Sequence, residues 1–108
     1  YRDRGLLEMK EEKYAEASRS LARAVELGLE DPATYNYLGI TYSRTNQLDL
    51  AVESYRRALA ADPNFAQAHL NLAYAYQRLN QPAAARQEYE TACRLDTNLC
   101  QYVPDRQK

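Results

Sequence analysis

The sequence predicts an all-α fold made of about three helix pairs that follow one another along the chain. Two observations support this prediction. A shift of 34 residues aligns alanine with alanine at two positions of every copy, at Ala17, Ala51 and Ala85 and at Ala24, Ala58 and Ala92. Apolar residues also recur at helical spacing within the copies. Such a period is typical of repeat arrays, in which each unit packs against its neighbours.

The second copy shows its two helices most clearly. Tyr35, Leu38 and Tyr42 lie at positions i, i+3 and i+7, which is one face of a helix. A second apolar stripe consists of Leu48, Ala51, Val52, Tyr55, Ala58 and Leu59. Asp31-Pro32 is expected to begin the first helix, because Asp caps free amides and Pro fits the first turn. Asp62-Pro63 is expected to end the second helix, because Pro cannot continue its hydrogen bonding.

Small residues are expected where the two helices of a copy come close together. Gly39 and Ala73 occupy this place in the first helices of two copies, and we expect Ala51 and Ala85 to face them. A larger side chain would push the two backbones apart. Gly28 is expected to end a helix, because glycine adopts the left-handed conformation at such positions.

The order of these residues resembles the tetratricopeptide repeat. The second copy carries the whole signature, with Leu38, Gly39, Tyr42, Ala51, Tyr55, Ala58 and Pro63. The third copy has Thr97 where proline is common, and the first departs from the pattern at Arg4 and Glu8. The resemblance implies a right-handed superhelical α-solenoid. We expect its units at residues 1–30, 31–64 and 65–98, followed by a C-terminal tail or partial capping helix at 99–108.

Pentatricopeptide repeats have a similar period and read single-stranded RNA. They are usually basic and lack this pattern of Gly, Tyr, Ala and Pro, whereas this chain has a net charge of −1. Attraction to nucleic acid or to an anionic membrane needs clustered positive charge. No apolar run is long enough to span a bilayer. We therefore predict no nucleic-acid partner and no membrane insertion.

The resemblance also implies a concave groove, lined by the first helix of each unit, that binds a protein or peptide. Helix geometry selects the lining residues Leu6, Lys10, Asn36, Tyr37, Ile40, Arg44, Asn71, Tyr74 and Arg78. They include an apolar row, Leu6, Ile40 and Tyr74, and a basic row, Lys10, Arg44 and Arg78. The two rows favour a segment with apolar and acidic residues, because arginine can donate two hydrogen bonds to one carboxylate.

Both rows also have a purely structural interpretation. A basic side chain near the end of a helix is stabilised by the helix dipole without any ligand. The apolar row can pack against the following helix. One subclass of the family holds acidic chaperone C-termini with Lys, Arg and Asn side chains. The corresponding residues here are Arg2, Leu6, Tyr37, Gln67 and Asn71, of which Arg2 alone keeps the charge, so we predict no chaperone partner.

The sequence predicts neither an enzyme nor a cofactor. His69 is expected to be a packing residue, because the other copies have tyrosine there and no acid–base partner is evident. No Cys/His set has metal-ligand spacing, and the three glycines form no phosphate-binding loop. We expect a scaffold or adaptor. The alternatives are an assembly element that forms a homo-oligomer through its end faces, and an accessory segment of a larger protein.

Cys93 and Cys100 have two interpretations. A continuous helix would hold them about 10 Å apart, which is too far for a disulfide. A helical hairpin after Asp96-Thr97-Asn98 would bring them together. We favour two reduced thiols, with Cys93 as a small core residue. Reduced thiols are typical of the cytoplasm, whereas a disulfide would indicate an oxidising compartment, periplasmic or secreted.

Overall fold

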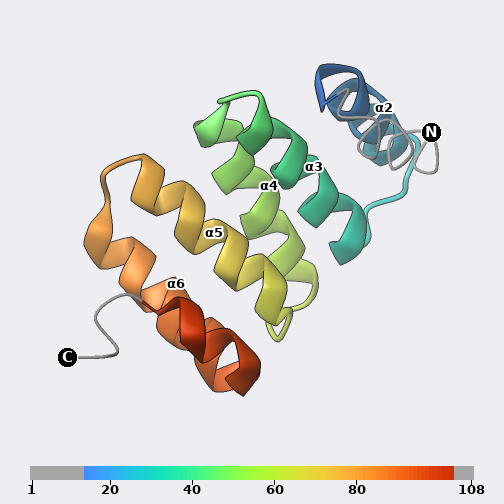
Figure 1. The fold of residues 1–108 in the computed structure, drawn as a ribbon. Coiled ribbons are helices and arrows are strands. Elements are labelled where there is room, and N and C mark those ends of the chain that lie inside the picture. Colours follow the sequence, from blue (N-terminus) through green and yellow to red (C-terminus); the bar gives the residue numbers. More distant parts are fainter. Residues whose placement is uncertain (1–13, 104–108) are drawn as a thin grey trace.

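The computed structural model describes residues 14–103, and this part of the chain is helical throughout, with no strand. Its elements are α2 (Tyr14–Glu26), α3 (Pro32–Arg44), α4 (Leu48–Ala61), α5 (Ala66–Arg78), α6 (Pro82–Leu95) and the 3-10 helix η1 (Thr97–Tyr102). They form an elongated array of 44 × 24 × 21 Å, in which α2 and α6 lie at opposite ends (Figure 1).

Helices that are neighbours in the chain are neighbours in space. The contacts between α3 and α4 and between α5 and α6 are the most extensive, and α2–α3 and α4–α5 join one pair to the next (Figure 1). The predicted all-α array of antiparallel helix pairs is confirmed. The exact limits of the units stay a prediction, and part of the unit expected at 1–30 lies outside the described residues.

The turns between helices repeat with the same period as the alanines. Asn46 and Asn80 both have φ 62°, in the left-handed region that asparagine tolerates. The amide of Gln47 then donates to the carbonyl of Tyr42 at 2.8 Å, and that of Gln81 to Tyr76 at 2.9 Å. Gly28 ends α2 with φ 102°, as expected. These backbone bonds satisfy carbonyls that would otherwise have no partner at the helix ends.

Aspartates shape the remaining connections. The Asp31 carboxylate accepts the N–H of Thr34 at 2.8 Å and so caps α3, as the sequence predicted. Asp62 and Asp96 adopt nearly the same backbone conformation, with φ −143° and −144°. Each carboxylate accepts the amide two residues further on, at 3.1 and 3.0 Å. The turn therefore forms equally well after Asp96, where Thr97 stands in place of the proline.

The core consists of the small residues of the repeat and the tyrosines between them. The alanines at the two invariant positions have exposed fractions of 0–3%; they are Ala17, Ala24, Ala51, Ala58, Ala85 and Ala92. Tyr55 and Tyr89 are both 2% exposed. Because alanine leaves space between two backbones, the neighbouring tyrosines can fill the seam between the helices.

Gly39 lies against the ring of Tyr55. A Cβ atom built on Gly39 would lie 2.5 Å from Cε1 and 2.6 Å from Cδ1 of that ring. The sequence correctly predicts a close approach at Gly39, but the nearest atoms belong to Tyr55 and not to the expected Ala51. The reason is that the tyrosine ring occupies the space that the missing side chain leaves open.

Replacing Gly39 with valine should therefore lower the free energy of unfolding by about 1–3 kcal/mol, because the ring of a buried tyrosine must move. Urea unfolding followed by circular dichroism measures the change. Ala60→Val on the exposed side of α4 is the matched control, with an expected change within about 0.5 kcal/mol. Equal losses in the two variants would contradict the contact.

Candidate functional site

Four of the predicted groove residues lie on α3 and α5, at matching places in the two helices. We call the surface formed by Ile40, Arg44, Tyr74 and Arg78 the α3–α5 face. The predicted groove residues Leu6 and Lys10 lie outside the described residues. Tyr37 is partly buried on α3.

The apolar part of the α3–α5 face is uneven. Ile40 is partly buried and packs against the core between α4, α5 and α6. Tyr74 is 39% exposed, and its ring forms an edge-to-face contact with that of Tyr89, with centroids 5.7 Å apart. The packing interpretation therefore fits Ile40, whereas Tyr74 presents part of its aromatic ring to solvent.

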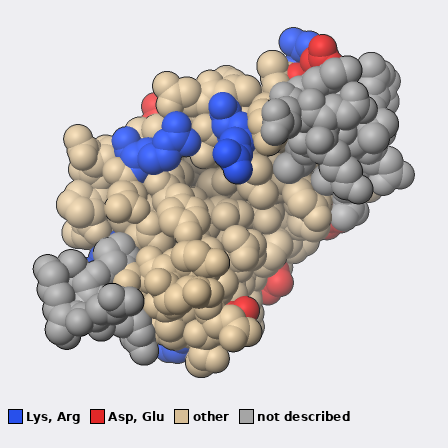
Figure 2. All heavy atoms as spheres, in the orientation of Figure 1, with Lys and Arg blue, Asp and Glu red and all other residues tan. Residues whose placement is uncertain are grey.

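Arg44 is exposed at the end of α3 and reaches back to α2. Its guanidinium lies 5.8 Å from the centre of the Tyr14 ring, which is a cation–π contact. Among the described residues, no carboxylate forms an ion pair with Arg44. Figure 2 shows two basic groups near the C-terminal ends of α3 and α5, with an uncharged area beside them. The Arg44 guanidinium can therefore accept an acidic ligand while it stays on the ring.

Arg78 holds the end of α3. Its Nη1 donates to the carbonyl oxygen and to Oγ of Ser43, both at 3.0 Å, and its Nη2 donates to Oδ1 of Asn46 at 3.1 Å. The first contact satisfies a carbonyl of the last turn of α3. The structural interpretation of the basic row thus accounts for Arg78, although its side chain remains exposed.

The two arginines influence the same buried group. Burial raises the pKa of the Tyr55 phenol well above its usual value, and the positive charges of Arg44 and Arg78 offset part of the rise. Both guanidinium groups therefore lie over one region between α3, α4 and α5. This shared position makes Arg44 and Arg78 one local patch of positive potential.

The two predicted asparagines bond with each other. Asn71 Nδ2 donates to Asn36 Oδ1 at 3.0 Å, and Asn71 Oδ1 accepts from Gln67 Nε2 at 3.2 Å. Asn36 is 5% exposed and so offers little surface to a ligand. The pair ties α3 to α5, and we assign it to the support of the α3–α5 face.

The segment after α6 folds back on α6 through a disulfide between Cys93 and Cys100. The preference for two reduced thiols was therefore wrong. The chain turns sharply at Asp96, and η1 begins in a new direction, which removes the separation that a continuous helix would impose. Leu99 and Val103 pack against the core that α6 shares with α5.

This fold-back adds an aromatic side chain that the sequence analysis missed. Tyr102 is 45% exposed. Burial raises the pKa of Tyr74, and the nearby Tyr102 adds to the rise, so the two phenols are close. The sequence does contain a signal for the position of this segment. Asp96-Thr97-Asn98 matches Asp62-Pro63-Asn64 one period earlier, and the match places the tail where the next helix of the array would start.

His69 has two polar partners, contrary to the expectation that it lacks any. Its Nδ1 lies 2.6 Å from Glu88 Oε1, and its Nε2 lies 2.9 Å from the carbonyl oxygen of Pro63. Because both ring nitrogens are engaged, the side chain fastens α5 to α6. In residues 14–103, no group of three or more His, Cys, Asp or Glu is arranged to hold a metal ion. No helix described by the structure is long and apolar enough to cross a membrane.

The sequence of these helices was compared with those of known proteins. Family models described as "TPR repeat" and "Tetratricopeptide repeat" match residues 41–80 and 66–99. Tetratricopeptide repeat protein 13 from Homo sapiens is 34% identical over 77 residues, which are 71% of this chain and 9% of that protein. The chain thus spans a small part of this relative.

Two solved structures share the fold. MamA has a TM-score of 0.87 at 22% identity and covers 89% of this chain, which corresponds to 56% of the MamA chain. The first TPR of Spaghetti (RPAP3), bound to the HSP90 peptide SRMEEVD, has a TM-score of 0.89 at 19% identity. That match covers 94% of this chain and 83% of the other.

The bond between the asparagines leads to a prediction on stability. Asn71→Ala leaves the buried Oδ1 of Asn36 without its donor, so the free energy of unfolding should fall by about 1–3 kcal/mol. Gln67→Ala removes only an exposed hydrogen bond to Asn71. It should change the free energy of unfolding by less than about 0.5 kcal/mol. Chemical denaturation of both variants makes the comparison, and equal losses would argue against the contact between α3 and α5.

The disulfide leads to a second prediction. Reduction of the bond between Cys93 and Cys100 should lower the free energy of unfolding by about 2 kcal/mol, because the unfolded chain gains conformational entropy when this loop is opened. Thermal unfolding with and without dithiothreitol measures the loss, and amide exchange should rise at Leu99 and Val103. The Cys100→Ser variant should not respond to the reductant. Two titratable thiols in the protein purified without reductant would contradict the bond.

Proposed function

Because the chain belongs to the tetratricopeptide repeat family, we propose that it is a protein-interaction module whose α3–α5 face binds a segment of another protein. The observation that carries this proposal is the placement of an exposed aromatic ring, Tyr74, beside two arginines on neighbouring helices. An apolar surface next to positive charge suits a segment that carries both apolar and acidic residues.

Arg44 is the residue that we propose as the anchor for a carboxylate. It is exposed and stacks on Tyr14 without an acidic partner in the described part of the chain. The contact with the ring restricts the position of the guanidinium, whose edge can donate two parallel bonds to a carboxylate. Arg78 already donates hydrogen bonds to Ser43 and Asn46, so it contributes mainly positive potential to the binding surface.

The aromatic pair at the other end of this face is the proposed contact for apolar side chains. Tyr74 and Tyr102 are 39% and 45% exposed, and each combines an apolar ring with a polar tip. The disulfide holds η1 against α6, so Tyr102 is positioned before a partner arrives. Pre-organised side chains lose less conformational entropy on binding.

The peptide bound by the first TPR of Spaghetti (RPAP3) shows that a related fold takes an acidic chaperone segment. We do not extend that ligand to this chain. The corresponding positions Tyr37, Gln67 and Asn71 carry no charge, and Asn71 is engaged with Asn36. The proposed ligand is instead an acidic segment held further along the helices, near Arg44.

Self-association through the end faces is the less favoured alternative. The side of α6 that would meet another helix pair carries Arg86 and Glu90, which pair at 3.4 Å. Val52, one period before Arg86, is 9% exposed and belongs to the core. A charged pair in place of a core valine makes this end a poor stacking surface. The role of an accessory segment in a larger protein is compatible with the proposed binding function.

The disulfide also supports a proposal on location. Disulfides persist where the surroundings are oxidising and are rare in the cytosol. The link between Cys93 and Cys100 therefore favours an oxidising compartment as the place where this chain works.

A peptide-display selection on the purified chain tests the binding function. The parent should enrich peptides in which acidic residues stand next to aromatic or aliphatic ones. Arg44→Glu should lower the affinity for the enriched peptides about tenfold or more, because a charge-assisted hydrogen bond is replaced by repulsion between two negative charges.

Arg94→Glu is the matched control, because Arg94 is exposed in the last turn of α6, just as Arg44 is in the last turn of α3. The two variants lose the same charge and the same favourable interaction with a helix dipole. Arg94→Glu should bind as the parent does. Equal binding by Arg44→Glu and the parent, or no enrichment at all, would overturn the proposal.

A further inference from the structure

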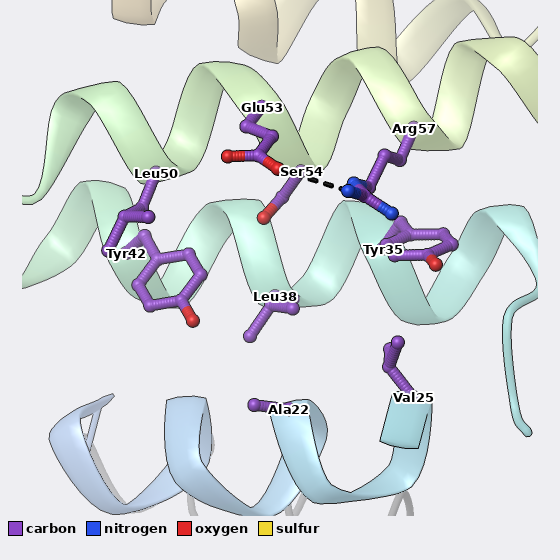
Figure 3. Close-up of a pocket in the computed structure, with 9 residues that line it drawn as sticks. All are labelled: Ala22, Val25, Tyr35, Leu38, Tyr42, Leu50, Glu53, Ser54 and Arg57. Atoms are coloured by element: carbon purple, nitrogen blue, oxygen red, sulfur yellow. Dashed lines mark hydrogen bonds and ion pairs between the residues drawn. The ribbon is translucent and has the colours of Figure 1, made fainter. Parts of the chain in front are cut away.

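A second candidate site lies on the other side of α3. A cavity of ≈ 170 Å³ opens between α2, α3 and α4. Leu38 and Tyr42 of α3 point into it, Ala22 lies opposite on α2, and Ser54 and Glu53 line the α4 side (Figure 3). Leu38 and Ile40 are two residues apart on α3 and so project in nearly opposite directions. The cavity is therefore separate from the α3–α5 face.

The repeat provides a direct comparison for this cavity. One period later, the same place lies between α4, α5 and α6, and Arg56 stands where Ala22 stands in the first copy. The guanidinium of Arg56 lies 5.7 Å from the centre of the Tyr76 ring and donates to the Tyr76 hydroxyl, with Nε at 3.0 Å. Tyr76 is the counterpart of Tyr42. In that copy the chain supplies its own arginine to the tyrosine.

A second pair of side chains occupies the later copy. Glu88 stands one period after Ser54, and His69 one period after Tyr35. The carboxylate and the imidazole meet at 2.6 Å. In the earlier copy the corresponding residues are a serine and a tyrosine whose hydroxyl donates to Glu30 at 3.0 Å. The replacement of Arg56 and Glu88 by Ala22 and Ser54 leaves the cavity open.

Two carboxylates and the Tyr42 hydroxyl lie at or near the cavity. Burial raises the pKa of Tyr42, and the negative charge of Glu53 raises it further, so that carboxylate acts on the phenol. Glu30 adds a second negative charge near Tyr35. Arg57 pairs with Glu53 at 3.2 Å and also bonds to Tyr35, and among the described residues it is the one cation that lines the cavity. Within the described residues, no side chain bonds to the Tyr42 hydroxyl.

We propose that this cavity binds an arginine side chain of a partner protein. The guanidinium donates to the Tyr42 hydroxyl and lies near the Glu53 carboxylate. The contact between Arg56 and Tyr76 shows the geometry that this fold imposes at the equivalent place. Arginine fits better than lysine, because its planar group can direct two N–H donors at one oxygen atom and is more weakly hydrated than an ammonium group. The site does not depend on the acidic ligand proposed above for the α3–α5 face.

Titration of the ¹⁵N-labelled chain with N-acetyl-arginine amide, followed by NMR, tests the proposal. Saturable shifts are expected at the amides of Ala22, Tyr42 and Ser54, with binding in the millimolar range. N-acetyl-lysine amide should shift them less. N-acetyl-citrulline amide has nearly the same shape without the charge and should leave them unchanged, as should N-acetyl-leucine amide.

Two variants locate the effect, each with a matched control. Ala22→Arg supplies the missing side chain from within and should abolish the shifts. Ala60→Arg adds the same residue to the exposed side of α4 and should preserve them. Tyr42→Phe removes one hydroxyl and should weaken binding roughly fivefold. Tyr76→Phe alters a hydroxyl that Arg56 already occupies and should have no effect.

Several outcomes would overturn the proposal. Absent shifts, equal shifts with citrulline amide, or larger shifts with leucine amide would show that the cavity does not select a guanidinium. Unchanged binding in both Ala22→Arg and Tyr42→Phe would place the ligand elsewhere. Tyr42→Phe keeps the buried ring, so the test holds even where Ala22→Arg disturbs the packing of α2.

Discussion

The close contact between the two helices of each pair is the constraint on which the rest of the structure depends. Ala51 and Ala85 are almost fully buried, and the ring of Tyr55 lies directly on Gly39. Small residues at these places let the backbones approach, and tyrosines then fill the space on either side. The distance between successive helices is thereby fixed, and with it the spacing of every side chain that α3 and α5 present to solvent.

The same constraint explains how one repeat can support different tasks. Two positions at the helix contact keep alanine in every copy, because a larger residue would alter the approach of two backbones. Positions between pairs are less restricted. Arg56 and Ala22 occupy one such position, and one closes a cavity while the other leaves it open. A difference between copies at such a position therefore indicates a difference in function, which a residue shared by all copies cannot do.

The sequence predicted the helices well and the polar contacts poorly, for a physical reason. Gly28 and Asp31 are local signals, because a cap or a left-handed residue acts within a few positions of itself. The partner of His69 lies 19 residues away on another helix, and that of Asn71 lies 35 residues away. Such contacts depend on how the helices are stacked and on the side-chain conformers, which the spacing of residues alone does not specify.

The cysteines and Arg78 illustrate the same limit. The two cysteines could pair or stay apart until the direction of the chain after Asp96 was known. Arg78 matches Arg44 in register, so the sequence treats the two alike. In the structure Arg78 reaches the turn after α3, whereas Arg44 lies over a ring of α2. Charge at a given register position is therefore a weaker guide to function than the neighbours that the charge meets.

Both proposed sites rely on the way α2 lies against α3. Arg44 lies over the ring of Tyr14 at the start of α2, and Ala22 of the same helix lines one side of the cavity beneath Tyr42. Coupling between two ligands is reciprocal, because it reflects one shared set of conformations. A cation that favours one placement of α2 against α3 would favour the stacked form of Arg44, and an acidic segment on Arg44 would favour the cavity to the same degree. Since Tyr14 and Ala22 lie on one rigid helix of 13 residues, this coupling needs no longer pathway through the array.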